Sequence, residues 1–153
     1  MLAKLDEEEF RKEVETVDQR VLATVGEFFG LMRQNGATLR LVAGKADTSF
    51  GTDDVARAAE RATSTAIEDT EETFEGELGG VLPDAYQFEF RAITPRDIVL
   101  RGRIERTISA TELTNFNRAL VGVSAKARLR VRRVRQHGQV VRESFTLLGL
   151  EKV

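Results

Sequence analysis

The sequence predicts an α+β protein: a long N-terminal helix and a short connector packed on a five-stranded, OB-like small barrel of element order β-β-β-α-β-β. Three observations lead to this prediction. Apolar residues recur every three or four positions over residues 6–33, the period of an amphipathic helix. From residue 70 onward the period changes to alternation, which is typical of half-buried strands. One helix signal separates the third strand from the fourth, the place where an OB-fold carries its helix.

The N-terminal segment predicts one helix over residues 6–33. Three glutamates, Glu7–Glu9, occupy its first turn, where the helix dipole favours negative charge, and Asn35-Gly36 would end it. Its near-heptad spacing fits pairing with a partner helix, and equally a helix that lies across its own domain. The candidate helix-pairing stripe consists of Phe10, Val14, Val17, Val21, Val25, Phe28 and Met32.

A short connector follows this helix. Alternation at Leu39 and Leu41 predicts a strand over residues 37–42, and the polar, glycine-flanked stretch 44–52 predicts a loop. A second helix is expected over residues 53–67, where a narrow stripe of small residues favours close packing on another element.

Alternating apolar residues predict five strands in a barrel region, residues 70–153, which we separate from a helical, acidic region, residues 1–69. A capping signal, Ser109 with Glu112 three residues later, opens the short helix after the third strand. An SH3-like barrel or a plain twisted sheet also contains five short strands, so both remain alternatives. The strands are expected at residues 70–80, 86–92, 98–105, 124–135 and 140–150.

Charge divides the chain in two. Residues 1–80 carry 9 Lys/Arg against 18 Asp/Glu, a net charge of −9, whereas residues 81–153 carry 14 against 7, a net charge of +7. The opposite signs favour pairing of the two halves, within one chain or head to tail between copies. Because surface ion pairs contribute only about 0–1 kcal/mol each, charge would orient such a contact and the apolar stripe would supply most of the association energy.

Cations gather on one side of the fourth predicted strand, where they alternate with apolar residues. Two more are expected to project the same way from a neighbouring strand. Crowded like charges repel, so this face favours an anionic neighbour, either an acidic protein surface or a nucleic-acid backbone. Proteins that bind single strands also present exposed aromatic rings, but the rings of the strand at 86–92 fall on the expected core side. The candidate anion- or partner-binding face consists of Arg101, Arg103, Lys126, Arg128, Arg130 and Arg132.

The composition offers few residues suited to catalysis. Cysteine is absent, which excludes disulfides, thiolate nucleophiles and Cys-ligated metals, and the single histidine, His137, falls in a predicted hairpin turn. No serine stands in the Gly-x-Ser-x-Gly setting of a nucleophile elbow. We therefore expect no enzymatic activity, no metal and no cofactor.

The start of the chain is acidic where a secretory leader would be apolar, and no stretch approaches the roughly 20 apolar residues that cross a bilayer. Together with the absence of cysteine, this favours a cytoplasmic protein that does not bind membranes.

Four stretches of the barrel region resemble a small β-barrel module found in uncharacterised bacterial proteins: residues 74–84, 88–90, 101–104 and 146–151. The shared motifs are glycines and core apolar residues, so the resemblance implies a fold and no activity. The sequence as a whole predicts a non-enzymatic protein-interaction or assembly module whose partner is another protein or a second copy of itself. The alternative is a barrel that binds nucleic acid, as single strands or by its backbone, through the basic face.

Overall fold

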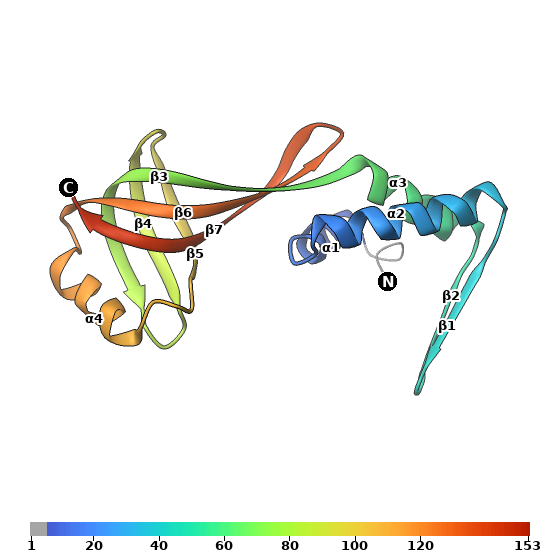
Figure 1. The fold of residues 1–153 in the computed structure, drawn as a ribbon, viewed down its shortest axis with the longest axis horizontal. Helices are drawn as coiled ribbons and strands as arrows, with labels where there is room; N and C mark the ends of the chain where they lie inside the picture. The colour runs from blue at the N-terminus through green and yellow to red at the C-terminus, as the bar shows by residue number, and fades with distance from the viewer. Residues whose placement is uncertain (1–5) are drawn as a thin grey trace. The chain divides into compact units, whose positions relative to one another are not determined.

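A computed structural model of the protein describes residues 6–153 (Figure 1). Over these residues the chain forms four helices and seven strands, so the α+β class is confirmed. The chain folds as two compact units. The helical unit takes the described residues up to Glu68 together with Arg133–Arg142, and the ring unit takes Asp69–Arg132 together with Glu143–Val153. Residues 133–142, which we expected inside the barrel region, therefore belong with the helices.

The helical unit begins with two helices, α1 (Glu7–Val14) and α2 (Gln19–Gln34), and the prediction of one uninterrupted helix over residues 6–33 is wrong. Asp18 lies between them with an extended backbone, and its carboxylate accepts a hydrogen bond from the Arg20 N–H at 2.7 Å. Aspartate is a strong N-cap because its side chain satisfies a backbone donor that the first turn of a helix leaves without a partner. The cap therefore starts a new helix and interrupts the stripe.

The connector contains a β-hairpin, β1 (Leu39–Ala43) and β2 (Ala46–Phe50), where we expected a strand followed by a loop. The strand is confirmed, but the loop predicted for residues 44–52 is wrong. Gly44 has a φ of +58°, the conformation that a type II′ hairpin turn needs at its first central position. The chain therefore turns back within two residues and pairs antiparallel along both strands.

The second predicted helix is α3 (Thr52–Ser64), which starts one residue early, with Gly51 at the N-cap. The Asp54 carboxylate accepts a hydrogen bond from the Gly51 N–H at 3.1 Å. The helix ends three residues before the expected boundary because a strand begins at the next residue. Small residues allow a close approach to α2, since a Cβ on Gly26 would lie 3.2 Å from the Cβ of Ala62.

Five strands hydrogen-bond in a closed ring, in the order β3-β4-β5-β7-β6. β4 pairs antiparallel with β3 and β5, whereas β5 and β7 run parallel, so the sheet is mixed. The helix α4 follows the third of these strands, which confirms the predicted element order. The elements are β3 (Thr65–Leu82), β4 (Gln87–Thr94), β5 (Ile98–Ile104), α4 (Ala110–Ala119), β6 (Ser124–Gln136) and β7 (Gln139–Lys152).

The first strand of the ring, β3, is longer than predicted and does not end at Gly79-Gly80. Its register with β4 shifts between Glu75 and Gly76 and again between Leu78 and Gly80. Such irregularities bend a strand and increase its twist, which helps a sheet of only five strands to close. Glycines tolerate this distortion, which is why a pair of them stands inside a strand rather than after it.

The core of the ring unit lies inside the ring. Alternate residues of β4 and of most of β6 point into it, and the fully buried Phe90 and Leu100 stand opposite each other on β4 and β5. α4 packs on this core through Leu113, which has no exposed surface. Asn117 fixes the helix to β3, because its side-chain amide accepts from the Val81 N–H and donates to the Val81 oxygen, both at 2.8 Å.

Two local sequence signals are confirmed in the ring strands and their helix. The Ser109 hydroxyl accepts a hydrogen bond from the Glu112 N–H at 3.2 Å, as the capping signal predicted. His137 and Gly138 both have positive φ, 52° and 77°, as in a type I′ turn between β6 and β7.

Candidate functional site

The alternation predicted for the basic strand is present in β6. From Ala125 to Val131 every second residue is apolar and fully buried, and the residues between them, Lys126, Arg128 and Arg130, are exposed. The pattern breaks at Arg132-Arg133, where two half-buried residues follow one another. The basic side chains of β6 therefore lie on the outer surface of the ring.

Arg101 and Arg103 do not join that surface. Both are exposed residues of β5, whose neighbours in the ring are β4 and β7. We expected them on a strand next to β6, but the parallel pairing of β5 with β7 inserts the last strand of the chain between the two. The six predicted cations therefore occupy two separate stretches of the ring.

Most of these cations are neutralised by carboxylates of the ring unit. Arg132 donates two hydrogen bonds to Asp69, at 2.8 and 2.9 Å, in the fork geometry that suits a guanidinium and a carboxylate. Over residues 6–153, neither Arg103 nor Arg128 has a carboxylate within ion-pair distance. The four paired cations are Arg101 with Glu89, Lys126 with Glu75, Arg130 with Glu105 and Arg132 with Asp69.

The charge imbalance along the sequence disappears within each folded unit. Counted over the sequence, the helical unit carries 12 Lys/Arg against 13 Asp/Glu and the ring unit 11 against 12, so each has a net charge of −1. The acidic strand β3 contributes carboxylates to the basic strand β6 in the ring unit. The basic hairpin tip lies with the acidic helices, where Arg135 pairs with Glu68 and Arg142 with Glu15. Pairing of the two halves therefore occurs within one chain.

The pair at Asp69 predicts a specific acid sensitivity. Arg132, with a smaller contribution from Arg130, holds the pKa of Asp69 below its ordinary value of 3.8. A lowered folded-state pKa adds stability that is complete above the ordinary value and is lost as pH falls through the folded one. Asp69→Asn should therefore lower the free energy of unfolding by under about 1 kcal/mol at pH 7, because the ion pair is partly exposed. Well below pH 3.8 the substitution should leave the free energy of unfolding unchanged.

Urea unfolding of this variant and the parent at pH 7 and at successively lower pH measures the effect. Glu71→Gln is the matched control, because Glu71 is an exposed carboxylate two residues along the same strand. A gap between Asp69→Asn and the parent that stays constant down to the lowest pH would contradict the prediction.

A surface groove of about 620 Å³ crosses β3, β4 and β5. Three of its lining residues, Gly79, Gly80 and Gly102, are glycines. Two of the expected cations, Arg101 and Arg103, stand along it. We call this feature the ring groove.

Charge along the ring groove follows the cross-strand register. Arg101 stands opposite Glu89, with which it forms an ion pair at 2.8 Å, whereas Arg103 stands opposite the neutral Gln87. Arg103 also borders a second cavity of about 420 Å³, in which the Arg106 guanidinium lies 4.3 Å from the ring centre of Tyr86. The uncompensated positive charge of the groove is therefore concentrated at the end of β5.

The predicted helix-pairing stripe is divided between the core and the surface of the helical unit. The interruption between α1 and α2 is the reason, because it lets α1 pack separately against α2 and α3. Four residues of the stripe, Phe10, Val14, Val17 and Met32, belong to apolar clusters. Val25 is half-buried. Val21 and Phe28 lie on the outer side of α2, where they are 53% and 49% exposed.

Sequence reasoning missed three further exposed apolar residues, which lie on α2 and β1 of this unit. Leu31 is 62% exposed on α2, and Leu41 and Val42 are 47% and 63% exposed on β1. Leu31 follows Phe28 by three residues and Val21 by ten, which places all three on one side of the helix. We call Val21, Phe28 and Leu31 the α2 stripe. The signal was present in the sequence, because apolar residues at this end of α2 are more numerous than a single buried stripe requires.

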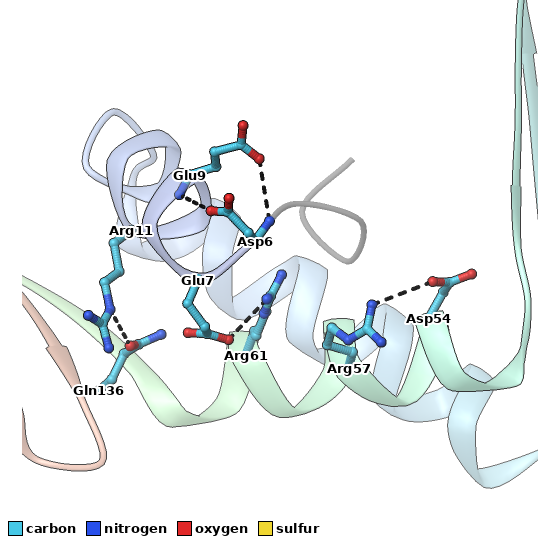
Figure 2. Close-up of polar contacts among 8 residues, drawn as sticks. All are labelled: Asp6, Glu7, Glu9, Arg11, Asp54, Arg57, Arg61 and Gln136. Atoms are coloured by element: carbon cyan, nitrogen blue, oxygen red, sulfur yellow. Dashed lines mark hydrogen bonds and ion pairs between the residues drawn. The ribbon is translucent and has the colours of Figure 1, made fainter.

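Polar contacts hold the rest of the helical unit together (Figure 2). Glu7 of α1 pairs with Arg61 of α3 at 3.0 Å, and the Arg11 guanidinium donates to the Gln136 side chain of β6 at 3.0 Å. Asp6 and Glu9 form a capping box at the start of α1. The first helix is thus fixed from both sides, whereas large apolar residues of α2 and of the hairpin β1–β2 stay exposed.

Over residues 6–153, no group of three or more histidine, cysteine or acidic side chains is placed to hold a metal ion. None of the helices in the same range is long and apolar enough to span a membrane. Comparison with known proteins gave no match to a family model, to a curated protein or to a solved structure. Of the expected resemblance, the five-stranded ring is the part that is observed.

Proposed function

We propose that this chain is a non-enzymatic protein-interaction or assembly module that binds its partner through the helical unit. The observation that carries the proposal is the hairpin β1–β2. At its base, Leu39 and Phe50 stand opposite each other and pack against residues of α2 and α3. Toward its tip, Leu41 continues the same side of the strand but is half exposed. The hairpin extends away from the helices that cover its base (Figure 1).

A two-stranded hairpin alone is only marginally stable in water. This hairpin exposes more apolar surface than a hairpin surrounded by solvent requires. Both faces of β1 carry an exposed large apolar residue, Leu41 on one face and Val42 on the other. Burying a large apolar side chain contributes about 1.5–3 kcal/mol, so covering the exposed halves of these two and the α2 stripe would contribute about 4–7 kcal/mol before ordering costs.

A photoreactive amino acid at position 28 or 41 tests this function in the cell of origin. We expect a discrete cross-linked protein at both positions, because both side chains lie in the proposed contact. A probe at Lys12, which is exposed on α1, is the matched control and should give no such product. Equal cross-linking at all three positions, or at none, would contradict the proposal.

We further propose that the ring is an OB-type barrel. Two features support this identity over an SH3-like barrel or a plain sheet. The element order β-β-β-α-β-β places one helix between the third and fourth strands. The ring order inserts the last strand between the third and the fourth, parallel to the third, which gives a closed five-stranded arrangement.

Nucleic-acid binding is the second candidate function, and the ring groove is the observation that favours it. In OB-folds, the face of strands 2 and 3 binds oligonucleotides, and β4 and β5 are the corresponding strands here. Arg103 supplies a cation that forms no ion pair within residues 6–153, next to the stacked pair of Arg106 and Tyr86. Two observations weaken the nucleic-acid candidate. The ring unit has a net charge of −1, and four of the six predicted cations already form ion pairs with carboxylates.

Salt titration of single-stranded oligonucleotide binding tests this candidate by fluorescence anisotropy. If the groove holds a phosphate at Arg103, Arg103→Ala should weaken binding and lower the slope of log K against log salt by about 0.7, the value for one lost contact on a single strand. Arg118→Ala, at an exposed cation of α4, should leave the slope unchanged. No binding by the parent at low salt would remove the candidate.

A further inference from the structure

We infer that the partner of the helical unit is a second copy of this chain, and that the two copies exchange hairpins: the apolar face of each hairpin covers the α2 stripe of the other. The inference rests on the interaction function proposed above. It assigns the exposed apolar residues of α2 and those of one hairpin face to one interface. Two copies related by a two-fold axis would bury each surface twice with a single contact that closes on itself.

The hairpin presents an apolar face suited to this contact. Residues directly opposite each other in an antiparallel pair share a face, as do residues two apart. One face of the hairpin therefore carries the pairs Leu41–Thr48 and Ala43–Ala46 beyond its covered base. We call these four residues the hairpin face. Their small size at the tip leaves a flat strip on which a helix can lie.

The other face of the hairpin carries charged residues beside the exposed Val42. It holds the ion pair between Arg40 and Asp47, in which the guanidinium donates at 2.9 and 2.6 Å to the two carboxylate oxygens. The Arg40 guanidinium also lowers the pKa of Asp47. The hairpin face carries no charged residue, so covering it costs less desolvation than covering the face that holds this ion pair.

The α2 stripe is equally open to a partner. α3 packs on the opposite side of α2, at Leu22 and Gly26, both of which are buried. The hairpin of the same chain leaves the stripe exposed, with Leu31 at 62%. Its side chains are larger than those of the hairpin face, so the large residues of one surface meet the small residues of the other.

Charge supports a second copy as the occupant. Glu27, the one carboxylate of α2, lies beside the stripe, and Lys45 stands at the tip of the hairpin. Neither forms an ion pair within residues 6–153. Exchange of hairpins brings opposite charges to the same edge of the contact, so the chain carries both halves of the complementary pair.

The exposed apolar area can be compared with what a stable dimer needs. Large side chains of this kind have about 150–200 Å² of surface, of which roughly half is exposed in the α2 stripe and Leu41. The four residues thus offer about 350 Å² per copy and about 700 Å² in a dimer. Stable interfaces bury about 1,200–2,000 Å² in total, so these side chains would supply between a third and about half of the area, and the flanking polar residues and the hairpin backbone would supply the remainder.

Disulfide trapping tests the exchange directly, because the chain contains no cysteine of its own. A preparation of Phe28→Cys is mixed with one of Leu41→Cys and oxidised mildly. We expect a cross-linked species of twice the chain mass that forms faster in the mixture than in either preparation alone. Leu41→Cys mixed with Ile93→Cys is the control, since Ile93 is 63% exposed on the ring unit and should not cross-link.

Sedimentation over a range of concentrations provides the second readout. Phe28→Gln and Leu41→Gln should each raise the dimer dissociation constant at least tenfold, while circular dichroism and thermal unfolding stay those of the parent, because both residues are exposed. Glu27→Lys and Lys45→Glu should each weaken the dimer, and the double variant should restore it.

Two outcomes would overturn the inference: a parent chain that stays monomeric with no cross-link between positions 28 and 41, or a dimer unaffected by both glutamine variants. These experiments test the hairpin exchange separately from the interaction function. If the chain is monomeric but photoreactive probes at positions 28 and 41 capture one discrete protein of different mass, the hairpin exchange is wrong. The proposed interaction function would still hold in that case.

Discussion

Gly102→Ala should lower the thermal midpoint of the ring unit by about 10 °C. A Cβ on Gly102 would lie 2.1 Å from the backbone oxygen of Phe145 and 3.2 Å from the ring of Phe88. The first contact is with the neighbouring strand β7, whose carbonyl cannot move away without opening the parallel pairing that closes the ring. We expect a cost of about 3 kcal/mol or more, and each kcal/mol shifts the midpoint by about 2–4 °C in a chain of this size.

Gly149→Ala is the matched control for this effect. Gly149 lies on β7, the strand that carries Phe145, but the nearest atom to an added Cβ is in the Arg128 guanidinium at 3.6 Å, an ordinary contact with the far end of a flexible side chain. The control should unfold within about 1 kcal/mol of the parent. Similar midpoints for both glycine variants would mean that β7 does not approach β5 as described.

The barrel region was more predictable than the helical one, and local periodicity explains why. Alternation along β4 and β6 and the serine cap of α4 depend on residues close in sequence, so they can be recognised without tertiary information. The division between α1 and α2 depends on whether Asp18 lies inside a helix or at an N-cap, and in the structure it is the N-cap of α2. Apolar spacing is the same on both sides of it, so periodicity alone does not reveal the break.

The candidate site shows a similar division. The exposed side of β6 followed from alternation, but the neutralisation of its cations did not. Arg132 and its partner Asp69 are 63 residues apart, and only the pairing of β3 with β6 in the ring brings them together. The position of Arg101 and Arg103 away from β6 also depends on the strand order, because the return path of β7 is not encoded in any local signal. The exposed hairpin was missed because a two-residue turn at Gly44 reads as a loop.

Phe90→Ala should remove about 3–5 kcal/mol from the free energy of unfolding, which is roughly a fifth or more of the stability of an ordinary domain. The Phe90 side chain is fully buried inside the ring, between Leu78 on β3 and Leu100 on β5 at the same level of the sheet. Its removal leaves a cavity that a closed ring cannot collapse to fill, because every strand is held by hydrogen bonds on both sides.

Ile93→Ala is the control that separates the loss of buried packing from the loss of a strand-favouring side chain on β4. Ile93 lies on the same strand, three residues on, but it is 63% exposed, so its truncation should cost under about 1 kcal/mol. Urea unfolding measures both variants, and an unchanged slope with a lower midpoint for Phe90→Ala would indicate lost stability without a change in the unfolded state. Equal costs at the two positions would mean that the side chains of β4 do not alternate between the interior of the ring and solvent, and the groove on its outer surface would lose its geometric basis with them.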